Sequence, residues 1–220
     1  MLPFVKKNIK EIWFNQVYLV FKGFTMIPRK SYIANLYLCF AKREVQGDVV
    51  ECGVWRGGMI AGIAKILRKY PREYYLFDSF EGLPDVQEID GQKAIEWQNN
   101  ADSNIYYNNC SAEEDYAIKA MQKAGCKNYK IIKGWFNTTL INASFNDGIS
   151  ILRLDGDWYE STMTCLEFLF PHVNKNGLII IDDYIMWDGC SRAVHDYLSR
   201  HQRPEKIREF NGIFYIVKAQ

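Results

Sequence analysis

Two pairs of aspartates stand in the second half of the chain, each directly after an apolar run. Asp155 and Asp157 follow one run, and Asp182 and Asp183 follow another. If the two runs are neighbouring parallel strands, the four carboxylates meet at the sheet edge where open α/β sheets bind their ligands. Carboxylates so close repel one another, and a divalent cation with oxygen ligands, such as Mg²⁺, relieves this repulsion. The alternative is solvated loop acids or helix caps, a role that suits Asp157.

A glycine-rich turn stands in the first half of the chain. Residues 51–58 read Glu-Cys-Gly-Val-Trp-Arg-Gly-Gly, the end of an apolar strand followed by small residues that open a helix. Glycines at such a turn let a ligand approach the backbone, and the helix N-terminus offers free N–H groups. Asp78 ends the next predicted strand, where a carboxylate can accept hydrogen bonds from both hydroxyls of a ribose. The spacing therefore indicates a nucleoside-containing cofactor.

Glu51 indicates which cofactor suits this turn. A carboxylate directly before the first glycine repels a dinucleotide pyrophosphate, but it attracts the cationic amino group of S-adenosylmethionine. Gly53, Trp55 and Gly57 of the same turn are further candidates for binding the cofactor. The alternative is that Glu51 is a structural residue whose charge is satisfied at the strand end.

Other candidates carry less information. Trp135 follows the predicted strand 129–133 and lies at the ligand-bearing edge, where it could flank an adenine; core packing fits it equally well. Ser161 and Cys190 have no evident base partner, so the sequence gives little support to nucleophilic catalysis.

Short apolar strands alternate with helices along most of the chain. The expected strands cover residues 48–54, 74–78, 129–133, 149–154 and 178–181, and the expected helices cover 59–67, 113–125 and 160–170. This alternation favours an α/β fold with a doubly wound, mostly parallel, Rossmann-like sheet. Asn211-Gly212, between two strand-like runs, predicts a C-terminal antiparallel hairpin. A parallel sheet that ends in such a hairpin is typical of class I methyltransferases.

Two segments stand apart from this pattern. Residues 1–46 are expected to form a helical segment or lid that packs on a catalytic domain at 47–220. On a helix, one apolar stripe contains Ile9, Ile12, Trp13, Val17, Val20, Phe21 and Phe24. We expect this stripe to pack on the core or on a second subunit, with attachment to a membrane surface as the minority alternative. Residues 84–111, which are polar and rich in Asn and Asp, are either a lid over the site or a tolerated insertion.

Composition excludes several classes of protein. A chain of 220 residues that is 48% hydrophobic can bury a large core, which excludes a disordered tail. The 27 Lys and Arg against 26 Asp and Glu leave a net charge of +1, so nothing indicates a nucleic-acid partner. The six cysteines form no CxxC pair and no zinc spacing, as is typical of buried thiols in a reducing compartment. We therefore expect a cytoplasmic protein.

Five segments, in order, resemble the macrocin O-methyltransferase family. They are residues 51–58, 78–84 (Asp-Ser-Phe-Glu-Gly-Leu-Pro), 134–136, 152–162 (which contains Leu-Asp-Gly-Asp) and 181–184. The resemblance implies a class I fold, S-adenosylmethionine as methyl donor, Mg²⁺, a sugar hydroxyl as acceptor, and often a homodimer. The N-terminal region is shorter than is typical of the antibiotic-modifying members, and residues 84–111 are unlike theirs. Both regions would shape the acceptor pocket.

Matched by position, the resemblance gives each motif residue a role. Asp155, Asp182 and Asp183 would bind the metal, and Asp157 would be the general base. The residues that would hold the methyl donor are Glu51, Gly53, Asp78 and Ser79, with Thr25 in an N-terminal segment that closes on the cofactor.

We therefore expect a Mg²⁺-dependent sugar O-methyltransferase in which Asp157 takes the proton of the acceptor hydroxyl. One alternative is a metal-dependent glycosyltransferase, because residues 155–157 also form an Asp-x-Asp pattern. Glu51 argues against it, since a carboxylate is unfavourable near a diphosphate. The other alternative is a non-catalytic binding protein that uses the apolar 9–24 helix as its surface. The four acids at one sheet edge argue against a non-catalytic binding protein, because such a protein does not need a cluster of carboxylates there.

Overall fold

The computed structural model describes residues 2–103 and 106–219, and a seven-stranded sheet forms its centre. The strands are β1 (Asp48–Cys52), β2 (Tyr74–Asp78), β3 (Tyr129–Lys133), β4 (Ile149–Leu154), β5 (Val173–Ile181), β6 (Arg208–Phe210) and β7 (Ile213–Val217). Their order is β3-β2-β1-β4-β5-β7-β6, with β7 antiparallel to both β5 and β6. The predicted mostly parallel sheet with a C-terminal antiparallel hairpin is confirmed.

The central strands carry the site because their ends are aligned. Every residue of β1 and β4 is buried, as is usual for parallel strands that are covered on both faces, and most of these residues are therefore apolar. In the sheet register Cys52 pairs with Leu154, and Leu154 pairs with Ile181. Asp155 and Asp182 therefore leave the sheet at the same edge, as predicted from the sequence.

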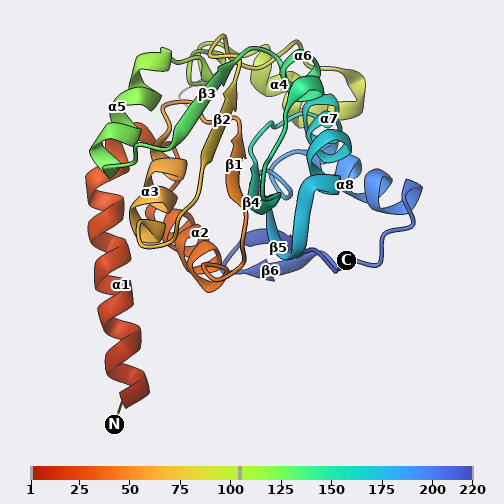
Figure 1. Cartoon of the computed structure of the whole chain (residues 1–220). Helices are drawn as coiled ribbons and strands as arrows, with labels where there is room; N and C mark the ends of the chain where they lie inside the picture. The colour runs from red at the N-terminus through yellow and green to blue at the C-terminus, as the bar shows by residue number, and fades with distance from the viewer. Residues whose placement is uncertain (1, 104–105, 220) are drawn as a thin grey trace.

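Helices cover both faces of the sheet (Figure 1). They are α1 (Leu2–Phe21), α2 (Arg29–Ala41), α3 (Gly58–Leu67), α4 (Gln92–Gln98), α5 (Glu114–Ala124), α6 (Phe136–Thr139), α7 (Tyr159–Leu169) and α8 (Asp188–Arg200). Helices α1, α2, α3 and α5 share one hydrophobic core with one face of the sheet. Helices α4, α7 and α8 share a second core with the other face.

The buried face of α1 differs from the predicted apolar stripe. Phe14, Val17 and Phe21 are buried where α1 packs on α2 and α3, whereas Ile9 and Ile12 are 61% and 58% exposed. The N-terminal turns of α1 extend past the body of the domain in Figure 1, so the core does not reach them. Ile9 and Ile12 therefore do not pack on the core of their own chain, and packing on a second subunit stays a prediction for them. Within residues 2–103 and 106–219, no helix, α1 included, combines the length and the apolar character needed to cross a membrane.

Residues 84–111 contain short helices and are packed on the domain. The 3-10 helix η2 (Glu88–Asp90) is followed by α4 and later by η3 (Asn108–Cys110), while residues 104–105 lie outside the described chain. Asp90 and Ala94 are buried. This segment therefore belongs to the wall of the domain, next to the ends of β4 and β5.

Candidate active site

A cavity of about 700 Å³ lies at the C-terminal ends of β1, β2, β4 and β5. Nine of the twelve predicted site residues line it: Gly53, Trp55, Asp78, Ser79, Trp135, Asp155, Asp157, Asp182 and Asp183. The other three, Thr25, Glu51 and Gly57, are not among the lining residues. The two groups of motifs, far apart in the chain, thus share one cavity.

Gly53 brings the two halves of the site together. Its φ of +83° is a left-handed conformation, and a Cβ there would lie 1.7 Å from the backbone oxygen of Asp155. Only glycine fits such a close approach. The position is therefore demanded by the contact between the ends of β1 and β4, a reason that the glycine pattern alone does not reveal.

Asp78 lies at the end of β2 and organises the turn after β1. Its carboxylate accepts hydrogen bonds from the backbone N–H of Trp55 at 2.8 Å and of Phe80 at 2.6 Å. Burial raises the pKa of Asp78, while these amide donors lower it. Ser79 donates to the carbonyl of Gly82 at 3.0 Å and so shapes the following turn. Asp78 keeps a place in the cavity wall, where a carboxylate has further lone pairs for ribose hydroxyls.

Glu51 is buried behind the cavity lining and does not belong to it. One carboxylate oxygen accepts the backbone N–H of Ile60 in α3 at 3.0 Å, and the other lies 2.7 Å from Nη1 of Arg153. The residue is 1% exposed. Burial raises the pKa of Glu51 to about 8, against the lowering effect of Arg153. These contacts fit the alternative in which the charge of Glu51 is satisfied at the strand end, and its role in binding the cofactor stays a prediction.

Thr25 and Gly57 lie near the cofactor turn without lining the cavity. Thr25 accepts the backbone N–H of Ile27 at 3.1 Å, and the residues that follow it, Met26 and Ile27, form part of the cavity wall. A Cβ on Gly57 would lie 2.9 Å from Cα of Ala117, so this glycine serves the packing of α3 against α5.

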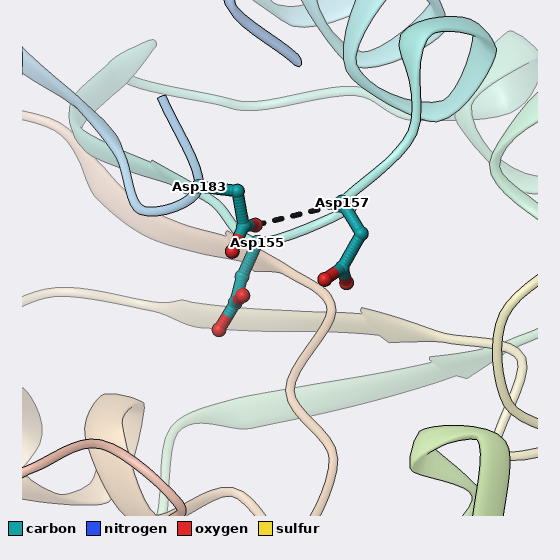
Figure 2. Close-up of side chains that lie close together, drawn as sticks. All are labelled: Asp155, Asp157 and Asp183. Carbon is teal, nitrogen blue, oxygen red and sulfur yellow. Dashed lines mark hydrogen bonds between the residues drawn. The ribbon is translucent and has the colours of Figure 1, made fainter. Parts of the chain in front are cut away.

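Three carboxylates that line the same cavity lie close together as a cluster (Figure 2). Asp155, Asp157 and Asp183 each offer an oxygen within 4.8 Å of the others. The backbone N–H of Asp157 donates to Asp183 at 3.3 Å, and Asp157 has a φ of +56°. Burial, and then the charge of Asp155, raises the pKa of Asp157 to about 7. Burial and the charge of Asp157 raise the pKa of Asp183 well above its usual value.

Asp182 lies in the same cavity but pairs with Arg153 instead of joining this cluster. Nη2 of Arg153 lies 2.5 Å from an oxygen of Asp182, and Nη1 lies 2.6 Å from an oxygen of Asp155. Burial raises the pKa of Asp182 to about 6, although Arg153 lowers it. One guanidinium, itself 1% exposed, therefore faces three carboxylates, including Glu51.

The model of the macrocin O-methyltransferase (TylF) family matches residues 20–215. The chain belongs to this family. A relative from Streptomyces olivaceus, the 8-demethyl-8-(2,3-dimethoxy-alpha-L-rhamnosyl)-tetracenomycin-C 4'-O-methyltransferase, is 35% identical over an alignment of 205 positions that covers 86% of this chain and 72% of the relative. The mycinamicin III 3''-O-methyltransferase of Micromonospora griseorubida is 32% identical over 87% of this chain and 77% of its own length.

Solved structures agree with the family membership. The O-methyltransferase NovP superposes with a TM-score of 0.74 and 29% identity, over 90% of this chain and 83% of NovP. The calicheamicin methyltransferase CalS11 has a TM-score of 0.66 at 18% identity, over 99% and 93% of the two chains, which is a likeness of fold. As a member of the family, the chain is an S-adenosylmethionine-dependent O-methyltransferase with the class I fold. These findings favour methyl transfer over the glycosyltransferase and over the non-catalytic binding protein.

Two residues of the site, Arg153 and Trp187, were not predicted from the sequence. Arg153 interrupts the apolar run of β4, and a lone arginine in a buried strand is a signal of paired carboxylates. Trp187 donates from its indole N–H to an oxygen of Asp157 at 2.8 Å. Nothing in the sequence near Trp187 indicates this contact, because the two residues are 30 positions apart and meet only through the order of β4 and β5.

Proposed function

We propose that this enzyme transfers the methyl group of S-adenosylmethionine to a sugar hydroxyl of a small molecule in a Mg²⁺-dependent reaction. The observation that carries the proposal is the shared cavity: Asp78, at the end of β2, and the cluster of Asp155, Asp157 and Asp183 line the same space. The names of the relatives support the acceptor class, since one acts on a rhamnosyl-tetracenomycin and another on mycinamicin III.

The donor set of the cluster fits Mg²⁺. All its side-chain donors are carboxylate oxygens, the ligands that hard divalent cations prefer. Arg153 supplies one positive charge against Glu51, Asp155 and Asp182, so negative charge is left over for a bound cation. Asp155 and Asp183 are the residues best placed to hold the ion, with Asp182 beside them as the third predicted ligand. When bound, Mg²⁺ orients neighbouring hydroxyls and makes their protons easier to remove.

Asp157 is the proposed general base. One of its carboxylate oxygens is occupied by the indole N–H of Trp187, and the residue lines the cavity. The other oxygen would take the proton of the acceptor hydroxyl while that hydroxyl oxygen bonds to the sulfonium methyl carbon. The carbon–sulfur bond then breaks, and S-adenosylhomocysteine leaves as a neutral thioether. Its pKa of about 7 suits proton transfer near neutral pH, where base strength and the deprotonated fraction are balanced.

The charge of the cavity favours an acceptor without phosphate groups. Six acidic residues line it: Asp78, Asp155, Asp157, Glu160, Asp182 and Asp183. Among its described lining residues there is no lysine or arginine. A diphosphate would meet like charges without a cationic side chain to pair with, which is the arrangement that suppresses a wrong ligand. We infer that a neutral or cationic glycoside is preferred over a sugar nucleotide.

Apolar side chains surround the mouth of the same cavity. Met26 and Trp135 are each 38% exposed, and Met186 and Ile185 are 51% and 74% exposed while lining it. Exposed apolar groups around a polar cavity are typical of a ligand-binding surface. The proposed acceptor therefore carries its sugar on an apolar group that rests on this rim.

We further propose that the enzyme acts as a homodimer in the cytoplasm. Ile9, Ile12 and Leu19 leave an apolar face of α1 exposed, and a second copy of α1 would cover it. All six cysteines are free thiols, which fits a reducing compartment. Light scattering of the purified protein tests the dimer: a monomer mass at micromolar concentration would reject it.

Calorimetry with S-adenosylhomocysteine in chelator tests the methyl-donor site. Asp78→Asn should abolish micromolar binding, whereas Asp85→Asn, an exposed acid seven residues further on, should leave it unchanged. The second stage offers p-nitrophenyl α-L-rhamnopyranoside and TDP-rhamnose as acceptors, with and without Mg²⁺. Methylation of the rhamnoside that requires Mg²⁺ is the expected outcome. A preference for TDP-rhamnose would overturn the inferred acceptor charge, and turnover in chelator would overturn the metal requirement.

A further inference from the structure

Three buried tryptophans form one cluster beside Asp157. The centre of the Trp187 indole ring lies 5.2 Å from the ring centre of Trp158 and 5.9 Å from that of Trp97. The ring centres of Trp158 and Trp97 are 6.1 Å apart. The rings meet at steep angles, the arrangement that aromatic pairs favour. Trp187 precedes α8, Trp158 precedes α7 and Trp97 belongs to α4. The cluster therefore joins three elements that are distant in the chain.

The indole N–H of Trp187 is directed at the carboxylate of Asp157. The distance from Nε1 to Oδ1 is 2.8 Å, and Trp187 is buried. A hydrogen bond to an ionised carboxylate is stronger and shorter than one between neutral groups. Asp157 is also held through its backbone, since its N–H donates to Asp183 and its φ of +56° is one that few residues adopt. Such a backbone conformation persists only where the surroundings enforce it.

Residues of the 84–98 stretch hold Trp187 in place. Lys93 of α4 donates from its ammonium to the carbonyl of Met186 at 3.0 Å, and the same ammonium lies 5.1 Å from the centre of the Trp187 ring. Trp158 donates from its indole N–H to the carbonyl of Pro84 at 3.0 Å. Asp90 accepts the backbone N–H of Tyr159 at 2.7 Å, at the start of α7. Three hydrogen bonds and one cation–π contact therefore tie this stretch to the elements that carry Asp157 and Trp187.

We propose that Trp187 is a positioning residue for Asp157, and that the 84–98 stretch keeps Trp187 in position through Trp97 and Lys93. The inference rests on the proposed role of Asp157 as general base. With Oδ1 held by the indole, rotation of the carboxylate is restricted and Oδ2 stays directed at the acceptor. A side chain held by packing and by a second hydrogen bond keeps the geometry that a catalytic group needs. The 84–98 stretch thus helps to keep the proposed general base, Asp157, in position, in addition to forming part of the cavity wall.

Nuclear magnetic resonance tests the contact without any acceptor. The six tryptophans give six indole N–H signals, and Trp187→Phe identifies the signal of Trp187 by its disappearance. In Asp157→Asn this signal should move upfield by more than any of the other five, because the charged partner is lost. Glu160→Gln, which removes a different carboxylate from the same cavity, should leave it in place. If the chemical shift of the Trp187 indole signal did not change in Asp157→Asn, the inference would be overturned.

Steady-state kinetics with p-nitrophenyl α-L-rhamnopyranoside distinguish a positioning role of Trp187 from an effect on protein stability alone. Trp187→Phe keeps an aromatic ring but lacks the donor, and it should lower kcat roughly 10- to 100-fold with little change in KM. Trp13→Phe is the control, because Trp13 packs against the hydrophobic core on the other face of the sheet; kcat should stay within threefold in this variant, whatever its change in melting temperature. In an Asp157→Asn background, Trp187→Phe should have no further effect on kcat, since the two changes act through one group.

The outcomes distinguish this inference from the proposed function. If Asp157→Asn retains wild-type kcat, the base role of Asp157 is wrong and the positioning role ends with it. If Asp157→Asn is inactive while Trp187→Phe has wild-type kcat, the base role stands and the role of Trp187 is wrong. Multiplicative losses in the double variant would likewise overturn the proposal, because Trp187 would then act independently of Asp157.

Discussion

The acidic residues at the carboxyl edge of the sheet fall into two groups with different surroundings. Glu51, Asp155 and Asp182 face the guanidinium of Arg153 at 2.5 to 2.7 Å; we call them the Arg153 group. Asp157 and Asp183, the outer pair, have no arginine or lysine partner among the ion pairs of the described chain. Asp155 belongs to the first group and also contacts the second through the cluster.

The Arg153 group and the outer pair therefore differ in how far the fold itself compensates their negative charge. In the Arg153 group the fold supplies one counter-charge of its own for three carboxylates, so these acids are partly neutralised before any ligand arrives. The outer pair keeps its repulsion: burial raises the pKa of Asp183, and the charge of Asp157 raises it further. A cation from solution relieves this repulsion, in competition with the protons that the raised pKa values favour. The number of acids at a sheet edge is thus a poor guide to metal ligands unless their built-in partners are known.

Asp157→Asn should have the largest effect on the outer pair. We expect kcat to fall by about 10²- to 10⁴-fold, the usual contribution of a positioned base, while the Kd for S-adenosylhomocysteine stays within threefold. Steady-state kinetics with the rhamnoside and calorimetry measure the two quantities. Glu160→Gln is the control for loss of a cavity carboxylate. A variant at near wild-type rate would remove Asp157 from this role.

Arg153→Met should destabilise the protein by removing the positive charge that the Arg153 group shares. Three carboxylates then lose their buried counter-charge, and removing one partner of a buried ion pair costs about 3–5 kcal/mol of unfolding free energy. Urea unfolding at pH 7.5 measures the loss. Arg43→Met is the matched control, because Arg43 pairs with Glu44 at the surface and such pairs contribute less than about 1 kcal/mol. Similar losses in both variants would contradict the balancing role of Arg153.

Asp183→Asn and Asp182→Asn compare one member of each group directly. The cluster contains Asp183, whereas Asp182 is engaged by Arg153. Mg²⁺ affinity, measured by calorimetry with S-adenosylhomocysteine present, should therefore fall more for Asp183→Asn. For Asp182→Asn we expect roughly the 10- to 100-fold loss typical of a residue that orients a metal ligand. The opposite ranking would restore Asp182 as a primary ligand, as predicted from the sequence.

The pH dependence of Mg²⁺ stabilisation should show the smallest effect. The folded-state pKa values of Asp157 and Asp182 are raised to about 7 and about 6, so the folded protein holds more protons than the unfolded chain between about pH 4 and pH 7. Without metal, their contribution to stability falls as the pH rises through this window. Mg²⁺ must displace these protons, so its affinity should drop by up to about tenfold per pH unit below pH 7 for each proton displaced. Melting temperatures with saturating and with no Mg²⁺ at pH 6 and pH 8 check this; a gain that is larger at pH 6 contradicts it.

The sequence predicts the fold well because its strands are local patterns. The apolar runs at 74–78 and 129–133 match β2 and β3 residue for residue, and Asn211-Gly212 forms the expected turn between β6 and β7. β5 begins at Val173, earlier than predicted, because polar residues at 174–176 hide its start. Local periodicity therefore identifies the elements and the sheet edge at which the acids gather.

The orientation of the site residues could not be predicted in the same way. Glu51 lies in a strand that is buried on both faces, so no alternation shows which face it occupies. Its partner Arg153 is 102 residues away and opposes it only through the register of β1 with β4. The link from Trp187 to Asp157 likewise depends on the order of β4 and β5 in the sheet. These contacts are set by the assembled sheet, beyond the reach of spacing along the chain.

The tryptophan cluster also gives the protein an optical signal of its own. Indole rings 5.2 to 6.1 Å apart have coupled electronic transitions, and coupled transitions produce a circular-dichroism couplet whose shape follows the angles between the rings. One ring of this cluster is a single hydrogen bond from Asp157. A movement of the carboxylate when a ligand enters would therefore change the spectrum. Compound collections can then be screened by light alone, without a dye, a coupled assay or an identified acceptor.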